Sequence, residues 1–187
     1  MKKIVWLCTL LATSALAQQQ FSLKQELQKL DAQATWKAVG PVQANAKLGL
    51  DRLQQYAITV PTGEGQSSTV TLLMGSGKGQ NHVRYASVIV KGEANRASEK
   101  AHSFVGQAII NYCFGLNRDE QGAVRDAMRS AMGKFKGQTV LEKFSAGRAR
   151  GEVSLKYNNP TVEIALTLER PDQPGQNGWK AFCGLES

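Results

Sequence analysis

The pattern of apolar positions predicts a helix near the start of the chain. Three leucines and an alanine recur at spacings of four and three over 23–34, which is typical of a narrow apolar stripe along one side of a helix. Ser22-x-x-Gln25 fits a capping box, in which two side chains bind free backbone N–H groups of the first turn. We expect a frayed polar leader at 18–20 and a helix that has ended by Gly40-Pro41.

Two later stretches alternate between apolar and polar residues, as half-buried strands do. The first group covers 56–60, 70–74 and 83–89, and its members are separated by glycine-rich turns. Three strands joined in this way predict an antiparallel meander.

The second group covers 140–144, 153–157 and 162–168, and Asn158-Asn159-Pro160 separates its last two members. We expect this hairpin to pair Lys156 with Thr161, because the apolar faces of the two strands then agree. This register places Arg148 opposite Glu169 on the polar face.

Helical spacing returns between the two strand groups. Apolar residues keep this spacing over 101–112, and Gly115 follows. Asn117-x-x-Glu120 then predicts the start of a second helix, whose apolar side extends to Phe135, with Gly133 as a C-cap. The order of elements predicts an α+β domain. We expect about six antiparallel strands in two three-stranded units, with the N-terminal helix and the central helix pair packed on one face.

The first 17 residues have the three parts of a cleavable secretory signal peptide. Lys2 and Lys3 precede an apolar run, and Ala15-Leu16-Ala17 is a small-x-small cleavage site. The apolar run has about 14 residues, whereas a membrane-spanning helix needs about 20, which disfavours the alternative of a retained anchor. Cys8 follows Trp6-Leu7, which is unlike the small residues of a lipoprotein signal. We predict one soluble domain over 18–187, with a tail at 171–187, exported to a bacterial periplasm or secreted.

Two cysteines remain after this cleavage, Cys113 and Cys183. An even pair in an oxidising compartment predicts a disulfide, and two buried thiols are the alternative. The bond would close a loop of about 70 residues, which stabilises a fold by about 4 kcal/mol in the chain-entropy description. Because there is no Cys-x-x-Cys motif, catalytic thiol chemistry is not expected.

Charge gives a weak indication of anion binding. Removal of Lys2 and Lys3 leaves 21 basic and 15 acidic residues, a net charge of +6. The charges are dispersed, and a solvated surface explains most of them. Four arginines have some pattern, since one pair falls on one side of a helix and the other pair on one strand face. These candidate anion-binding residues are Arg125, Arg129, Arg148 and Arg150.

No motif predicts catalysis, a metal or a cofactor. The loop at 75–79 lacks the spacing of a phosphate-binding P-loop. His82 and His102 lack the partners of a Ser-His-acid site, and Ser103 points about 100° away from His102 on a helix. No zinc-ligand spacing occurs, and Glu152 and Glu163 lie on a polar sheet face, a weak geometry for glycoside hydrolysis.

The sequence therefore favours an exported, non-enzymatic protein, a binding or envelope-associated domain. An exported hydrolase with an active site scattered along the chain is one alternative. A binder of anionic polymers through the four arginines is the other. The expected partner is an anionic polymer or an envelope protein.

Overall fold

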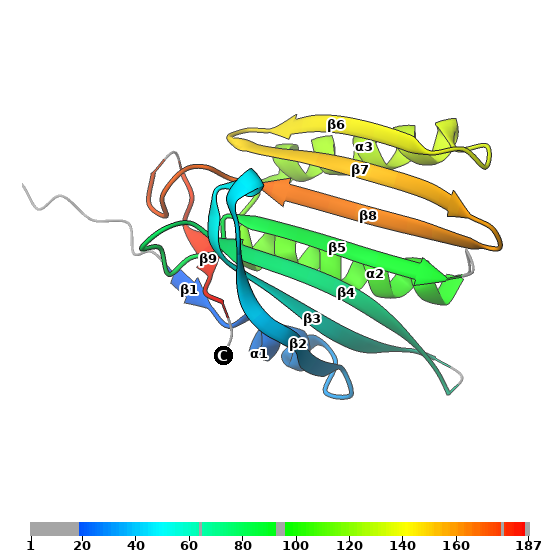
Figure 1. Ribbon diagram of the computed structural model, residues 1–187, viewed down its shortest axis with the longest axis horizontal. Coiled ribbons are helices and arrows are strands. Elements are labelled where there is room, and N and C mark those ends of the chain that lie inside the picture. The colour runs from blue at the N-terminus through cyan, green and yellow to red at the C-terminus, as the bar shows by residue number, and fades with distance from the viewer. Residues whose placement is uncertain (1–18, 64, 93–95, 177, 186–187) are drawn as a thin grey trace, which may run out of the picture.

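A computed structural model describes residues 19–63, 65–92, 96–176 and 178–185 (Figure 1). The predicted signal peptide at 1–17 lies outside the described residues. Those residues form a mixed α+β fold with a large antiparallel sheet. Its helices are α1 (Leu23–Leu30), α2 (Arg96–Ala108) and α3 (Arg118–Lys134), with a 3-10 turn, η1 (Ala46–Leu48), and a π-helix, η2 (Ile109–Cys113), that continues α2.

The large sheet contains seven strands in the order β2-β3-β4-β5-β8-β7-β6. They are β2 (Thr35–Asn45), β3 (Leu50–Gly63), β4 (Gln66–Ser76), β5 (Tyr85–Gly92), β6 (Val140–Ala146), β7 (Ala149–Asn158) and β8 (Thr161–Glu169). The two predicted meanders, β3-β4-β5 and β6-β7-β8, are both present and antiparallel. They join into one sheet because β5 pairs with β8.

The prediction of six strands was wrong because β2 was missed. The first helix ends at Leu30, where Asp31 already has extended backbone angles. The chain then forms β2 and pairs with β3 from Thr35 onward, with Trp36 against Tyr56 at a ring-centroid distance of 4.5 Å. Threonine, tryptophan and valine favour a pleated sheet, so they override a helical pattern that had only Ala34 to extend it.

The predicted register of the last hairpin was wrong by two residues. Asn158 pairs with Thr161, so that Leu155 lies opposite Ile164 and Arg150, rather than Arg148, lies opposite Glu169. The turn therefore needs only Asn159 and Pro160. A shift of two residues keeps every side chain on its expected face, because side chains alternate with a period of two.

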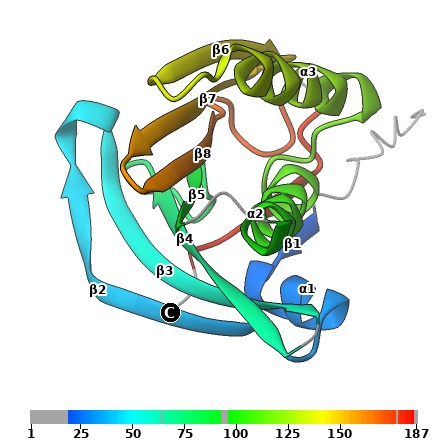
Figure 2. The ribbon, with the colours of Figure 1, turned by 90° about the vertical axis from the view of Figure 1, so that its right-hand side faces the viewer.

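All three helices lie on the same side of the sheet, as Figure 2 shows in a view along the strands. α2 contacts β3, β4 and β5, whereas α3 contacts β6 and β7. Asn117 caps α3 as predicted, since its side chain accepts from the N–H groups of Asp119 and Glu120 and the Glu120 carboxylate accepts from the Asn117 N–H. Gly133 lies within α3 and is not its C-cap, because the helix continues to Lys134.

The two ends of the described chain pair with each other. β1 (Gln19–Phe21) is parallel to β9 (Ala181–Cys183), with Phe21 opposite Cys183. The expectation of a frayed leader at 18–20 was therefore wrong for Gln19 and Gln20. The partner of β1 is the segment Ala181–Cys183, which lies far away in sequence, so a local pattern does not reveal this strand.

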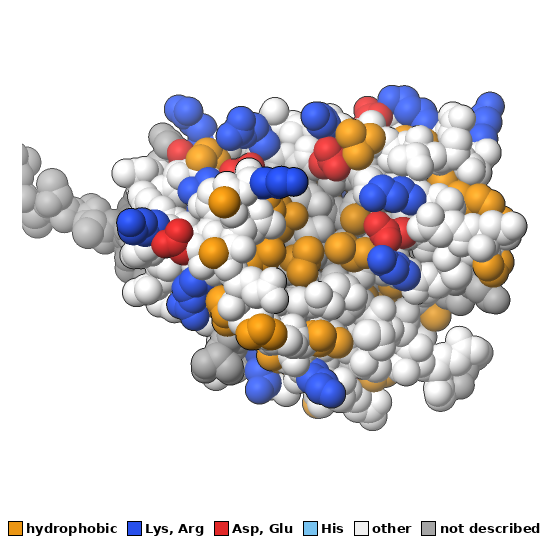
Figure 3. All heavy atoms as spheres, viewed as in Figure 1, with side chains coloured by type: hydrophobic (Ala, Val, Ile, Leu, Met, Phe, Trp, Pro, Cys, Tyr) orange, Lys and Arg blue, Asp and Glu red, His pale blue; other side chains and the backbone are white. Residues whose placement is uncertain are grey.

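On the opposite face of the sheet, no helix is formed by the residues that the structure describes. Figure 3 views this face and shows apolar side chains in its centre with charged side chains around them. The β2–β3 ribbon curls toward this side (Figure 2). On this face of the sheet, hydroxyl side chains pair across strands, Ser87 of β5 with Thr167 of β8 at 2.9 Å and Thr59 of β3 with Thr69 of β4 at 3.0 Å. Such pairs satisfy the polar groups of a half-exposed sheet.

Candidate functional site: a groove between α2 and α3

The spacing of the helices leaves one strand uncovered on the helical side. α2 lies over β3 to β5 and α3 over β6 and β7, so β8 lies between them. α2 contacts β4 most and α3 contacts β6 most, so three to four strand spacings separate the helix axes, or roughly 14–19 Å at about 4.8 Å per strand. Packed helices lie only about 8–10 Å apart. A gap roughly 5–10 Å wide therefore remains above β8.

This gap is a groove with a volume of about 780 Å³, which we call the α2–α3 groove. Its floor is formed by four apolar side chains of β7 and β8, and its walls by the facing stripes of the two helices. The floor residues are Val153, Leu155, Ile164 and Leu166; the wall residues are Glu99, His102, Ser103, Gly106 and Gln107 from α2, Ile110 from η2, and Val124, Arg125, Met128, Arg129, Met132 and Gly133 from α3.

Helical spacing explains why these walls face each other. The α2 residues fall at steps of three and four, so they form one continuous stripe. Gly106 stands in the middle of this stripe, and an added Cβ atom there would lie 3.6 Å from Leu166. The missing side chain lets α2 lie close to the sheet while the space beside it stays open.

An amide cluster closes one end of the groove. Gln107 donates to Asn111 at 3.0 Å and to Gln121 at 3.3 Å, which joins α2 to α3. Gln121 donates to Asn111 at 3.2 Å and to the Leu116 carbonyl at 2.8 Å. These bonds lie beside the short connection between the helices and fix their spacing there.

The other end of the groove is open. The two helices run antiparallel (Figure 1), so the first turns of α2 face the last turns of α3. Met132 lines this end with 52% of its surface exposed, and a Cβ atom added to Gly133 would have no neighbour within 4 Å. An exposed methionine beside open space is a typical feature of a surface that adapts to an apolar ligand.

His102 is a buried polar residue in the wall of the groove. Only 3% of its surface is exposed, and its Nε2 lies 3.2 Å from the Val88 carbonyl oxygen. Burial lowers the pKa of His102 to about 4, despite the opposing effect of the bond to Val88. The ring is therefore neutral at physiological pH.

The two rims differ in charge. Arg125 and Arg129 line the α3 rim, whereas Glu99 lies on the α2 rim. Arg129 is 81% exposed and pairs with Asp126 at 3.2 Å, an exposed ion pair that solvent weakens. Arg125 takes part in none of the ion pairs formed among the described residues. The predicted pair on α3 thus borders the groove.

The other two candidate arginines lie elsewhere, so the four do not form one surface. Arg148 is in the turn between β6 and β7 and not on a strand. Arg150 lies opposite Glu169 in the sheet. Because Val153 faces the groove, Arg150, three positions away, faces the uncovered side. The predicted shared face of Arg148 and Arg150 was wrong, since the strand begins only at Ala149.

The histidines do not form a catalytic set. His82 precedes β5, packs edge-on against Trp179 at 5.2 Å, and has its pKa lowered by burial and by Arg84. His102 and exposed Ser103 both line the groove, yet no hydrogen bond joins them among the described residues. Glu163 pairs with Lys91 at 2.9 Å and with Lys156, away from Glu152. Within the described ranges, no three His, Cys, Asp or Glu side chains gather in a group that could hold a metal ion.

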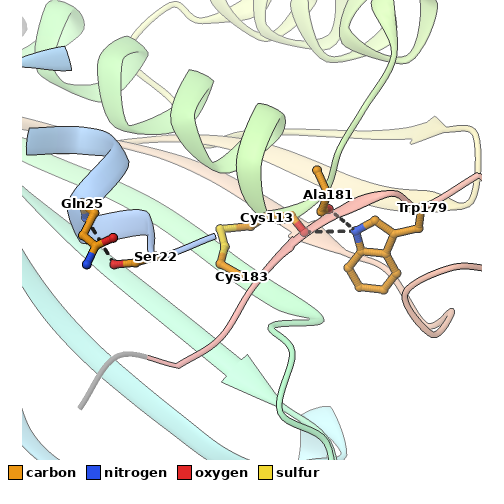
Figure 4. The surroundings of a disulfide bond; sticks show 6 residues. All are labelled: Ser22, Gln25, Cys113, Trp179, Ala181 and Cys183. Carbon is orange, nitrogen blue, oxygen red and sulfur yellow. Dashed lines mark hydrogen bonds between the residues drawn. A yellow bond between two sulfur atoms is a disulfide. The ribbon is translucent and has the colours of Figure 1, made fainter. Parts of the chain in front are cut away.

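The C-terminal tail holds the π-helical end of α2. Cys113 and Cys183 lie at disulfide distance, with Cα atoms 4.6 Å apart, as the sequence predicts (Figure 4). The buried Trp179 indole donates to the Cys113 carbonyl at 3.1 Å. The Arg170 guanidinium stacks over this indole at 4.9 Å and donates to the Phe114 carbonyl at 3.0 Å. This end of the helix is therefore fixed from outside the groove.

The sequence did not reveal the groove. Val124, Met128 and Met132 were assigned to the apolar side of the second central helix, where a core residue and a groove residue have the same spacing. Two methionines on one stripe followed by Gly133 were the available signal, because methionine adapts to an irregular surface and glycine leaves space open. The spacing between the helices depends on the strand order, which the sequence did not give.

Comparisons with known proteins give no match to a family model, a curated protein or a solved structure. None of the helices in the described ranges is long and apolar enough to cross a membrane. The function is therefore inferred from the groove itself.

Proposed function

We propose that this protein is an exported, non-enzymatic binding domain that holds an amphipathic anion in the α2–α3 groove. The apolar chain of the ligand lies on β7 and β8, and its acidic group meets Arg125 and Arg129. The observation that carries this proposal is an apolar groove of about 780 Å³, closed at one end and bordered by two arginines. This volume falls within the range of about 300–1,000 Å³ found for small-molecule sites.

The width of the groove favours a hydrocarbon chain over a peptide helix. A helix with its side chains is about 10–12 Å across, whereas the groove offers roughly 5–10 Å beyond normal helix packing. Carbon atoms in contact lie about 3.5–4.0 Å apart, so a single methylene chain fits between the helices. Each methylene that it buries contributes about 0.8 kcal/mol.

The rim supports an acidic head group. A guanidinium binds a carboxylate or phosphate oxygen through paired N–H donors. Both α3 arginines are exposed, so their side chains can turn toward a ligand at little cost. The neutral His102 offers no charge to an anion, which leaves the rim as the site of the head group.

The test uses tetradecanoate, an unbranched carboxylate, and a matched pair of glycine variants. Gly133→Leu and Gly122→Leu each replace a glycine in α3, but only Gly133 lines the groove. We expect Gly133→Leu to weaken binding roughly tenfold, because its side chain displaces about two methylenes. Gly122→Leu should bind tetradecanol like the parent protein, since its Cβ atom would lie outside the groove, 3.9 Å from the Arg125 guanidinium that an alcohol does not need.

Both variants should unfold at higher temperature than the parent, since leucine is a better helix former than glycine by nearly 1 kcal/mol. Loss of binding without loss of stability therefore locates the ligand. Arg125→Gln combined with Arg129→Gln should weaken tetradecanoate but not tetradecanol. No binding to the parent protein, or equal binding to the two leucine variants, would contradict the proposal. Tight heparin binding that these variants leave unchanged would instead favour an anionic polymer.

A further inference from the structure

His102 places a polar ring in a wall whose neighbours on the sheet are apolar. It is 97% buried, since 3% of its surface is exposed. The ring lines the same groove as Leu155, Ile164 and Leu166. A buried polar group without a partner costs about 1–3 kcal/mol, so the hydrogen bonds of this ring matter.

The bond to Val88 fixes which nitrogen carries the proton. A carbonyl oxygen only accepts, so the Nε2 that faces it must be the N–H. A neutral imidazole has one N–H, which leaves Nδ1 as an acceptor. Among the described residues the Val88 carbonyl is the ring's one hydrogen-bond partner. Nδ1 therefore has acceptor capacity that no described residue uses.

The position along the groove separates this acceptor from the amide cluster. His102 precedes Gln107 by five residues, or about 7.5 Å of helix rise toward the open end. Arg125 follows Gln121 by four residues, or about 6 Å of rise, so it lies at nearly the same level as His102, and Arg129 lies about 6 Å further toward the open end. A chain whose head group binds Arg125 or Arg129 on the rim therefore places the carbons next to its head group beside His102.

We propose that His102 is a specificity-determining residue that selects chains bearing a hydroxyl group over plain chains. The hydroxyl donates to Nδ1 of His102, and the remaining carbons lie on the apolar floor. The ligand class is then a hydroxylated long-chain carboxylate. This inference rests on the proposed function of the groove, and it adds which of the amphipathic anions the groove prefers.

The experiment compares tetradecanoate with a panel of its monohydroxylated isomers, in which the hydroxyl moves along the chain. Calorimetry on the full mature chain gives each dissociation constant. We expect one or two adjacent isomers to bind roughly two- to tenfold more tightly than tetradecanoate, the range that a single neutral hydrogen bond supplies. Isomers with the hydroxyl elsewhere should bind more weakly than tetradecanoate, because they bury an unpaired donor.

Two variants separate recognition from folding. His102→Leu removes both nitrogens and should abolish the preference while tetradecanoate still binds. His102→Gln has an amide N–H for Val88 and a carbonyl that can accept, so it should retain part of the preference. A purely structural histidine would not produce this pattern.

The failure of this inference differs from the failure of the proposed function. If the parent protein binds tetradecanoate but no isomer better, the hydroxyl preference does not exist and water serves Nδ1. If His102→Leu keeps the preference, another residue determines it and the inference is wrong. If neither tetradecanoate nor any isomer binds, the groove proposal itself fails.

Discussion

The His102 imidazole is buried in its neutral form, and this links folding to pH. Burial lowers its pKa from 6.5 to about 4 in the folded protein. Below pH 6.5 the unfolded chain takes up a proton that the folded chain does not, so acid favours unfolding. The pKa of His82 is also lowered, by burial and by Arg84, so it acts in the same direction.

We therefore predict that the free energy of unfolding is highest above pH 6.5 and falls as the pH decreases toward 4. His102 contributes roughly 3 kcal/mol to this loss, from about 1.4 kcal/mol per pKa unit. Urea denaturation at a series of pH values measures it. His102→Gln, which does not titrate, should flatten the curve, and an unchanged slope in this variant would contradict the assignment.

Arg170 is a buried cation, and its surroundings predict a large cost of removal. Only 2% of it is exposed, and it donates to the Phe114 carbonyl beside Asp172 and Trp179. Burial lowers the pKa of Arg170, while Glu120 and Asp172 oppose this change. The protein thus encloses a charge that needs all of these neighbours.

Arg170→Ala should lower the free energy of unfolding by about 3 kcal/mol or more, because it leaves buried acceptors without a partner. Arg150→Ala is the matched control on the exposed side of the sheet and should change it by less than about 0.5 kcal/mol. Chemical denaturation of both variants measures these changes in the free energy of unfolding. Equal effects would mean that the Arg170 cluster contributes no more than a surface arginine.

At the scale of elements, the tail segment depends on its covalent link. It is held by β1, by Trp179 and by Cys183, and few other apolar side chains lie within it. The seven-stranded sheet is packed against α2 and α3 independently of this segment. We therefore expect the tail to be the first part to separate from the fold.

Reduction of the Cys113–Cys183 pair should release the tail while the sheet remains folded. Trp36 and Trp179 are the tryptophans that would remain after the proposed cleavage, so a Trp36→Phe variant of residues 18–187 reports on Trp179 alone. Its fluorescence should shift to the red on reduction, while far-ultraviolet circular dichroism stays constant. Two titratable thiols in the unfolded, unreduced protein would contradict the bond, and simultaneous loss of both signals would contradict the order of release. A Cys113→Ser and Cys183→Ser double variant should not respond to reductant.

The elements that the sequence predicted correctly are those with a strong local signal. Asn117 with Glu120 fixed the start of α3, and unbroken alternation over 162–168 fixed β8. The sequence analysis missed β2 because the side chains of this strand are mostly exposed and so lack an alternating pattern. It missed the strand Gln19–Phe21 because the partner of this strand, Ala181–Cys183, is far away in sequence.

The site was less predictable than the fold. Arg125 and Arg129 were chosen for their helical spacing, and this spacing does place both on the groove rim. The predicted common strand face of Arg148 and Arg150 was wrong because Arg148 lies in the turn before β7 begins at Ala149. His102 was considered only as a possible catalytic residue, since the Val88 carbonyl that fixes its tautomer lies on a strand and cannot be inferred from the local sequence.

At the scale of the whole molecule, one layer of helices covers a sheet that is wider than the layer. A seven-stranded sheet spans about 29 Å from edge strand to edge strand, at about 4.8 Å per spacing. α2 and α3 side by side cover about 20 Å of it. Either the two helices pack against each other and leave an edge strand uncovered, or a groove remains between them. The groove is present here, with the amide cluster at one of its ends and with α1 in contact with α2.

The first and last described strands, β1 and β9, lie together in this architecture, which bears on export. We propose cleavage after Ala17, which would make Gln18 the first residue, next to β1 at Gln19. The new end would then enter the strand that pairs with the segment carrying Cys183. Cleavage, strand pairing and oxidation would thus act on the same part of the molecule.

N-terminal sequencing of the protein from its own host should give Gln18 as the first residue, and the protein should fractionate outside the cytoplasm. Ala17→Leu places a large residue at the small-x-small site, so this variant should accumulate as an uncleaved precursor. A protein expressed without residues 2–17 should remain in the reducing cytoplasm with two free thiols, because disulfides form in oxidising compartments. Its tail should then be released as in the chemically reduced protein, with Trp179 exposed and the sheet intact. A mature protein that still begins at Met1 and stays in the cytoplasm would overturn the export proposal, and it would remove the compartment on which the disulfide depends.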